Sequence, residues 1–331
     1  MCCQRLSEAN AKTRFSGTIV KCKILATGPE SAFTFSCVLR LLSIFVIAVH
    51  SRISTGVWAQ EKPVIVTSFT VIKEWVQVIG GKDFEIINLI PPRSETHGYQ
   101  PSPRNARDLR RATLIVAMNP ELEPWLAAWC QANHKSESVL WLYPESSSTR
   151  ESHIGGNPHV WTCAPEVKQM LREIADRLTK IRPDLDTQTP YNQYVKVINR
   201  VDDELAQLFG GLAHDQRTFI SQHPNLTPFA RHYGLTVAET ILASAAAESA
   251  DPSAHHFASL LTLIRKEKIR VVVSDAGQND AFARRLTEDA GIPAPIALSF
   301  EYLEPAGQPG DTWASMMLLN GQRLHQALGR R

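Results

Sequence analysis

Three histidines and one aspartate lie at positions from which their side chains could meet around a metal ion. His97 follows a predicted strand, and His159 lies just before a long predicted helix. His223 and Asp275 each lie at the carboxyl end of a predicted strand. Open α/β sheets bind ligands outside the carboxyl ends of their strands. Long intervals separate the four residues, so spacing alone leaves open that they are unrelated surface or capping residues.

The side-chain types of this group favour zinc. Three neutral imidazoles and one carboxylate suit a tetrahedral divalent ion, and Zn²⁺ is the ion that most often takes this set. Manganese favours more carboxylate oxygen. Thiolates are absent from the group, which argues against Cu(I) and iron–sulfur centres.

An α/β framework is expected to position these residues, because short β-rich runs alternate with helical patterns and so predict mainly parallel sheets. The expected strands are Val64–Ser68, Phe84–Ile90, Leu114–Met118, Val139–Leu142, Thr218–Ser221, Leu235–Ile241, Arg270–Ser274 and Ala297–Phe300. The expected helices are Val71–Ile79, Pro103–Arg111, Glu121–Ala132, Pro165–Ile181, Tyr191–Leu212, Thr227–Tyr233, Ala254–Lys268, Asp280–Ala290 and Thr312–Leu328.

These elements divide into two α/β lobes. We expect an N-terminal lobe over residues 60–187, a linking segment over 188–212 and a C-terminal lobe over 213–331. The link is one long helix with a continuous apolar stripe, which predicts a rigid connection. A site built from both lobes would then lie in the cleft between them.

Residues 1–59 read as a leader, with a signal peptide within 38–59. Arg40 precedes the uncharged run Leu41–Val49, and Val57-Trp58-Ala59 resembles a signal-peptidase site. The run is too short to span a bilayer, which needs about 20 apolar residues. The alternative is a buried N-terminal helix. Because the stretch before the apolar run is unusually long, we hypothesise that the true start lies near Val38.

Composition narrows the class of protein further. The chain has 331 residues with 44% hydrophobic and 21% charged residues, which is ordinary globular composition. The formal net charge of +2 gives no nucleic-acid-binding field. Four of the six cysteines lie in the leader, and the sequence leaves open whether Cys130 and Cys163 pair.

Several motifs resemble one family in order along the chain. These are LIPPRSETHGYQPSPRNARDLRRATLIV, NPHVWTCAPEVKQM, ISQHPNLTPFARHYGL, DPSAHHFASLLTLIRKEKIRVVVSDAG and DTWASMMLLNGQRLHQAL. They are similar to the His motifs and flanking helices of the cluster A-I, ZnuA/TroA-type solute-binding proteins of metal ABC transporters. The resemblance covers residues 63–328.

The resemblance implies a fold, a site and a role. It implies His97, His159, His223 and Asp275 as metal ligands. It also implies a monomeric periplasmic protein, not an enzyme, that delivers a divalent metal to an ABC permease. Manganese-binding members tend to have a carboxylate at the third position, so His223 favours zinc over manganese.

The chain departs from the family pattern in three places. The loop before His159 is short and holds one extra histidine, His153, either a solvated residue or an auxiliary zinc-capture ligand. The segment after His223 reads PNLTP instead of an aromatic-rich stretch, and the acidic ligand is Asp instead of Glu.

Two other functions stay open at this stage. A two-lobe binder of a metal chelate, such as haem or a siderophore, would use a large apolar or Arg-lined cleft. A secreted zinc hydrolase would use an open position on the metal to activate water. It would also need a general base, for which Glu95 is the nearby candidate.

Overall fold

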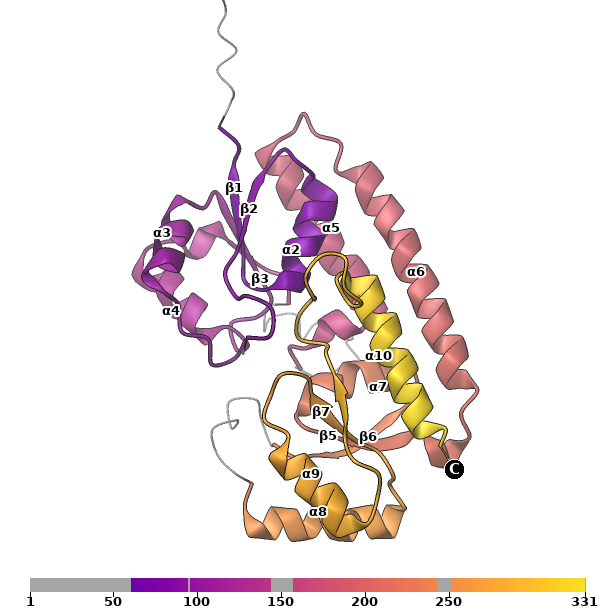
Figure 1. The fold of residues 1–331 in the computed structure, drawn as a ribbon. Helices are drawn as coiled ribbons and strands as arrows, with labels where there is room; N and C mark the ends of the chain where they lie inside the picture. The colour runs from indigo at the N-terminus through magenta and orange to yellow at the C-terminus, as the bar shows by residue number, and fades with distance from the viewer. Residues whose placement is uncertain (1–60, 95, 144–156, 243–251, 331) are drawn as a thin grey trace, which may run out of the picture. The chain divides into compact units, whose positions relative to one another are not determined.

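A computed structural model describes residues 61–94, 96–143, 157–242 and 252–330. The predicted leader, Glu95 and His153 lie outside these residues. The described chain forms two α/β lobes, as the alternating pattern predicts (Figure 1). Each lobe contains a sheet of four parallel strands.

The N-terminal sheet has the strand order β2-β1-β3-β4. Its strands are β1 (Val64–Thr67), β2 (Glu85–Asn88), β3 (Leu114–Ala117) and β4 (Val139–Trp141). The accompanying helices are α2 (Thr70–Gly80), α3 (Pro103–Arg111), α4 (Pro124–Ala132) and α5 (Ala164–Ile181), with short 3₁₀ turns η1 (Ser136–Ser138) and η3 (Val160–Thr162). Every residue of β1 and β3 is buried, as expected for strands covered on both faces.

The C-terminal sheet repeats this topology with the order β6-β5-β7-β8. Its strands are β5 (Thr218–Ser221), β6 (Thr236–Thr240), β7 (Val272–Asp275) and β8 (Ile296–Leu298). The helices are α7 (Thr227–His232), α8 (Ala254–Glu267), α9 (Ala281–Ala290) and α10 (Trp313–Leu328), with 3₁₀ turns η4 (His214–Gln216) and η5 (Pro224–Leu226).

A single long helix, α6 (Gln188–Gly210), connects the two sheets and packs against α5 and α10 (Figure 1). Its contact with α10 is close. A Cβ atom at Gly321 of α10 would collide with the side chain of Leu205 on α6, so only glycine permits this approach.

All eight expected strands are present: β5 has the expected bounds, and the ends of the others differ by one or two residues. The largest differences are at helix ends. The helix expected from Glu121 begins at Pro124, because Asn119 and Glu123 use their side chains to hold a turn before it. The linking helix begins at Gln188, three residues before the expected Tyr191. Ser102 caps the N-terminus of α3, and Asn105 completes a reciprocal capping box.

The two cysteines beyond the leader do not pair: Cys130 and Cys163 are both free, buried thiols. Burial raises the pKa of Cys130 to about 11 and that of Cys163 to about 12, so both stay protonated at neutral pH. Within the described residues, no helix is long and apolar enough to cross a membrane.

Candidate metal centre

The structure brings the three predicted histidines together from both lobes. His97 lies in the loop after β2, His159 lies immediately before η3, and His223 lies two residues after β5. One side-chain nitrogen of each lies within 4.8 Å of the others. The Nε2 atoms of His97 and His159 are 3.1 Å apart. The carboxyl ends of the two parallel sheets therefore face the same point, as the strand positions predict.

Asn157 orients His159. Its Oδ1 atom lies 2.8 Å from Nδ1 of His159 and accepts the backbone N–H of the same residue at 3.0 Å. This contact occupies Nδ1 and leaves Nε2 directed at His97. The Asn157 Nδ2 atom donates to the carbonyl of Pro224 at 2.8 Å, directly after His223. One side chain thus ties together the segments that carry His159 and His223.

Asp275, predicted as the fourth ligand, lies against the ring of His223. Its Oδ2 atom lies 2.6 Å from Nδ1 of His223. The reason is the sheet order: β5 and β7 are neighbours, so a residue at the end of β7 lies beside the residue that follows β5. The Asp275 carboxylate therefore contacts Nδ1 of His223 and leaves Nε2 of that ring to the site. Asp275 does not belong to the group of converging ligand atoms, which are those of His97, His159 and His223.

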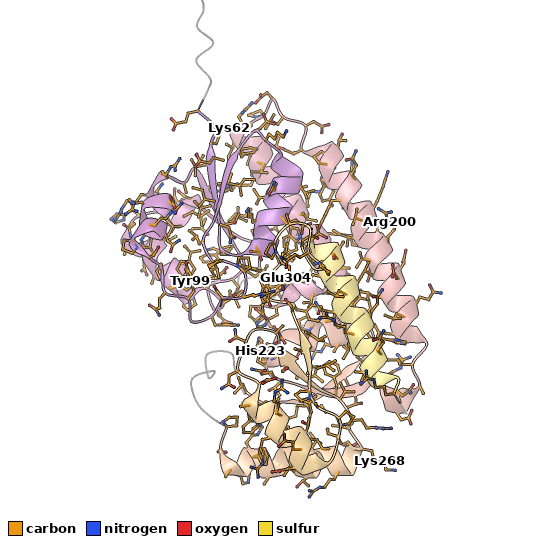
Figure 2. All side chains as sticks on the ribbon, in the orientation of Figure 1. Lys62, Tyr99, Arg200, His223, Lys268 and Glu304 are labelled. Atoms are coloured by element: carbon orange, nitrogen blue, oxygen red, sulfur yellow. The ribbon has the colours of Figure 1, made fainter. Side chains whose placement is uncertain are left out.

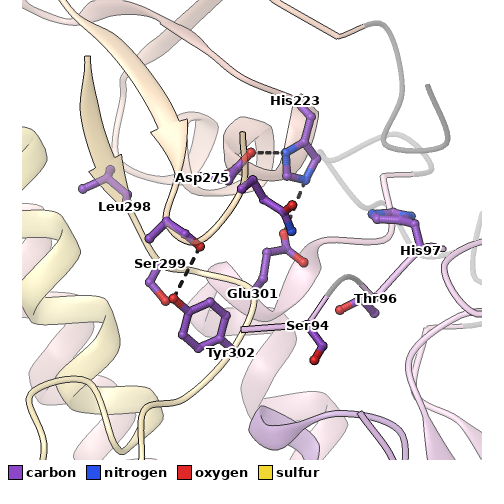
Figure 3. A pocket seen from close by; sticks show the side chains of 11 residues that line it. Ser94, Thr96, His97, His223, Asp275, Leu298, Ser299, Glu301 and Tyr302 are labelled. Carbon is purple, nitrogen blue, oxygen red and sulfur yellow. Dashed lines mark hydrogen bonds and ion pairs between the residues drawn. The ribbon is translucent and has the colours of Figure 1, made fainter. Parts of the chain in front are cut away.

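A second carboxylate, which the sequence analysis did not single out, lies at the other nitrogen of His223. Oε1 of Glu301 is 3.4 Å from Nε2 of His223 and 3.9 Å from Nε2 of His159. Figure 3 shows Asp275 and Glu301 on different sides of the His223 ring. The signal was present in the sequence, because Glu301 follows the strand β8 just as His223 follows β5.

Asn225 holds the two carboxylates in register. Its Nδ2 atom donates to Oδ1 of Asp275 at 2.8 Å and to Oε1 of Glu301 at 3.2 Å. Asn225 and Asp275 are buried, and Glu301 is half-buried. The acidic groups around His223 are therefore fixed by hydrogen bonds instead of moving freely in solvent.

Two of the printed separations are close to those of a tetrahedral metal site, and a third is longer. Zn–N and Zn–O bonds of about 2.0–2.1 Å place tetrahedral ligand atoms about 3.3 Å apart. The pairs observed here are 3.1 Å, 3.4 Å and 3.9 Å. Nε2 of His223 is buried and makes no hydrogen bond, although Glu301 lies close to it. A buried nitrogen without a hydrogen-bond partner beside a carboxylate and two further imidazoles suits a divalent cation.

The electrostatic environments of two of the histidines differ. Burial, and then the neighbouring His223 and His97, hold the pKa of His159 well below its usual range. For His223, burial alone opposes protonation, but the Asp275 and Glu301 carboxylates outweigh it and raise the pKa well above the usual range. The site therefore combines a neutral imidazole with one held between two acidic groups, and its carboxylates favour a cation.

A small pocket opens beside His97 and His223 (Figure 3). Most of the residues that line it are polar by type, among them Ser94, Thr96, Gln278 and Tyr302 along with Glu301. Figure 2 places His223 between the two sheets. The other described histidines lie elsewhere; Nε2 of His232, for example, lies 2.6 Å from Oδ1 of Asp202 on α6.

Comparison with known proteins finds similar proteins that are named as metal-binding proteins. The chain is 25% identical over 281 residues to the zinc-binding lipoprotein AdcA of Streptococcus pneumoniae, an alignment that covers 79% of this chain and 55% of AdcA. It is 24% identical to the iron-binding protein YfeA of Yersinia pestis, covering 88% and 97% of the two chains. The chain thus spans only about half the length of AdcA.

Solved structures share the fold. The periplasmic zinc-binding protein TroA from Treponema pallidum matches with a TM-score of 0.73 at 21% identity, covering 81% of this chain and all of TroA. A cadmium-bound periplasmic metal-binding protein from Candidatus Liberibacter asiaticus matches with a TM-score of 0.69 at 17% identity, with the same coverage.

The family profile described as zinc-uptake complex component A, periplasmic, matches residues 65–327. This range includes both sheets, the linking helix and all three histidines of the site. The protein therefore belongs to the family of the periplasmic component A of zinc-uptake complexes.

Proposed function

We propose that this protein is the solute-binding component of an ABC importer, which captures a divalent metal ion in the periplasm and delivers it to a membrane permease. The observation that carries the proposal is the convergence of His97, His159 and His223, with one ligand atom of each within 4.8 Å of the others. Family membership and the two-lobe fold support the same role.

We propose His97, His159, His223 and Glu301 as the four ligands. Glu301 replaces Asp275 in this set because its carboxylate faces Nε2 of both His223 and His159. Asp275 instead receives the role of orienting His223 through Nδ1, as carboxylates beside metal-bound histidines commonly do. His153 lies outside the described residues, and its part in metal capture stays a prediction.

Zinc is the preferred ion of this proposal. Three imidazole nitrogens and one carboxylate oxygen form a set typical of tetrahedral zinc, whereas manganese favours sites richer in oxygen. Four protein ligands occupy a tetrahedral ion completely and leave no position for an activated water. This arrangement favours a carrier over a zinc hydrolase, and the small size of the pocket favours a bare ion over a bulky chelate. We expect the carrier to act as a monomer.

Elemental analysis of the purified protein tests the proposal. The wild type is expected to hold one zinc per chain, and so is the control variant His214→Ala, which replaces an exposed histidine. The triple variant His97→Ala/His159→Ala/His223→Ala is expected to hold no zinc. Titration with manganese and iron under the same conditions measures the preference among ions. A wild-type protein that takes up no zinc would overturn the proposal and would favour the alternative function, binding of a metal chelate.

A further inference from the structure

An ion pair joins the two segments that carry His97 and Glu301. Nη2 of Arg93 lies 3.0 Å from both carboxylate oxygens of Glu304. Arg93 lies four residues before His97, and Glu304 lies three residues after Glu301. The ion pair thus connects the His97 loop of the N-terminal lobe to the Glu301 segment that follows β8.

The Glu304 side of this contact is held in place by the backbone. The N–H of Leu303 donates to Oγ1 of Thr70 at the start of α2, at 2.7 Å. The N–H of Glu304 donates to the carbonyl of Gly310 at 3.0 Å. The chain is therefore held by hydrogen bonds at Leu303 and at Glu304, and Glu304 serves as the anchor of the pair.

The His97 loop is held differently at its two ends. On the far side of His97, Oη of Tyr99 hydrogen-bonds to the carbonyl of Leu89 at 2.9 Å and to Asn105 at 3.1 Å, so this end is tied within its own lobe. On the near side, Arg93 reaches across to the Glu301 segment. The Arg93 contact therefore bears directly on how closely His97 approaches the ligands of the other lobe.

Arg93 adopts a strained backbone conformation. Its φ angle is +62°, in the left-handed region that non-glycine residues rarely occupy. A residue in such a conformation persists only when its surroundings hold it there. The side-chain contact with Glu304 is one interaction that holds it, so loss of that contact allows the loop to relax.

The segment that carries Asp275 meets the same point. A Cβ atom at Gly277 would lie 3.9 Å from Cβ of Arg93 and 3.7 Å from Oη of Tyr302. Gly277 follows Asp275 by two residues, and Tyr302 follows Glu301 directly. Ser94, Gln278 and Tyr302 line the pocket beside the histidines, and Arg93 directly precedes Ser94 in the chain.

We propose that the Arg93–Glu304 ion pair is a clasp that slows release of the bound cation by holding the His97 loop against the Glu301 segment. This inference rests on the proposed function. Neither residue contacts the ligand atoms, so both are positioning residues. The Arg93 side chain is 62% exposed and that of Glu304 is 17% exposed, which makes the pair accessible to salt and to competing charges.

The test measures zinc release from the loaded protein by mixing with excess chelator. Arg93→Gln and Glu304→Gln are each expected to release zinc about three- to fivefold faster than wild type, the range for a partly exposed ion pair. The double variant is expected to be no faster than either single variant, because both remove the same contact. The charge-swapped variant Arg93→Glu/Glu304→Arg is expected to recover part of the slow release.

Two controls separate a clasp from a general loss of stability. Arg111→Gln removes another ion pair, with Glu85 at 2.7 Å on the surface of the same lobe, and should leave zinc release unchanged. Raising the salt concentration should speed release from wild type and have little effect on Arg93→Gln. Unfolding midpoints of all variants by circular dichroism check that they are folded.

The outcomes are distinguishable. Equal release rates for wild type and Arg93→Gln, or additive effects of the two single variants, would overturn the clasp while leaving the metal-carrier function intact. Failure of wild type to bind zinc at all would instead overturn the proposed function on which the clasp rests.

Discussion

The carboxylate of Asp275 lies 2.6 Å from Nδ1 of His223, and the carboxylate of Glu301 lies 3.4 Å from Nε2 of the same ring. One imidazole is thus flanked by two acidic groups with different access to the site. Glu301 also lies near Nε2 of His159, whereas Asp275 does not belong to the group of converging ligand atoms. The two carboxylates should therefore respond differently to substitution.

Removing the charge of Glu301 should weaken metal binding more than removing that of Asp275. Glu301→Gln deletes a proposed ligand and should lower zinc affinity by at least about a hundredfold. Asp275→Asn keeps a hydrogen-bond acceptor at Nδ1 of His223. It should lower zinc affinity about tenfold, which is at the lower end of the effects seen for groups that orient metal ligands. Competition with a chelator of known affinity measures both. The reverse order would restore Asp275 as the ligand.

Asn157 should contribute to affinity by holding the ring of His159. Asn157→Ala removes the Oδ1 contact to Nδ1 and the bond to the Pro224 carbonyl, so His159 loses its fixed orientation. We expect zinc affinity to fall about tenfold, measured by the same chelator competition. The matched control is Asn199→Ala, whose side chain contacts Lys168 on an exposed surface. Equal affinities for the two variants would show that Asn157 has no orienting role.

Trp161 should report metal binding. Its ring centroid lies 5.1 Å from that of His159, and its Nε1–H donates to the Phe300 carbonyl, next to Glu301. Zinc addition is therefore expected to change the intrinsic tryptophan fluorescence of wild type. Trp161→Phe should abolish most of this change and lower the free energy of unfolding by about 1–3 kcal/mol, because the Phe300 carbonyl is left without its donor.

The control for this experiment is Trp141→Phe on β4, which should keep the zinc-dependent change. A change that persists in Trp161→Phe and disappears in Trp141→Phe would assign the signal to a different region of the protein.

Glu74 should make the stability of the metal-free protein depend on pH. Burial raises its pKa from 4.5 to about 7, although the Trp313 N–H and the Tyr194 hydroxyl donate to it. Between about pH 4.5 and 7 the folded protein holds a proton that the unfolded chain has lost. The free energy of unfolding should therefore fall as pH rises through this window, with a contribution from Glu74 of at most about 1.4 kcal/mol per pH unit.

Urea unfolding across this pH range measures the effect. Glu74→Gln should flatten the curve, because glutamine does not titrate. Glu121→Gln, at an exposed position, should leave the slope of unfolding free energy against pH unchanged. The buried Glu123, whose pKa burial also raises to about 7, should preserve a residual slope in Glu74→Gln. An unchanged slope in Glu74→Gln would show that Glu74 does not carry the effect.

The sequence by itself determined the framework and the three imidazoles. Alternating hydrophobic runs are local properties of the chain, so all eight strands could be located from it. The parallel order then followed from the intervening helices. His97, His159 and His223 could be selected because their motifs resemble those of one family, whereas their positions alone left open that they are unrelated.

Only the tertiary structure decided how the carboxylates are distributed. Asp275 ends β7 and Glu301 follows β8 in the same sheet, and chain position alone does not decide their roles. Their roles depend on which strand lies beside β5: β7 does, so Asp275 meets Nδ1 of His223, and Glu301, one strand further, reaches Nε2. The contact between Arg93 and Glu304 likewise joins residues 211 positions apart, and only the packing of the two lobes brings them together.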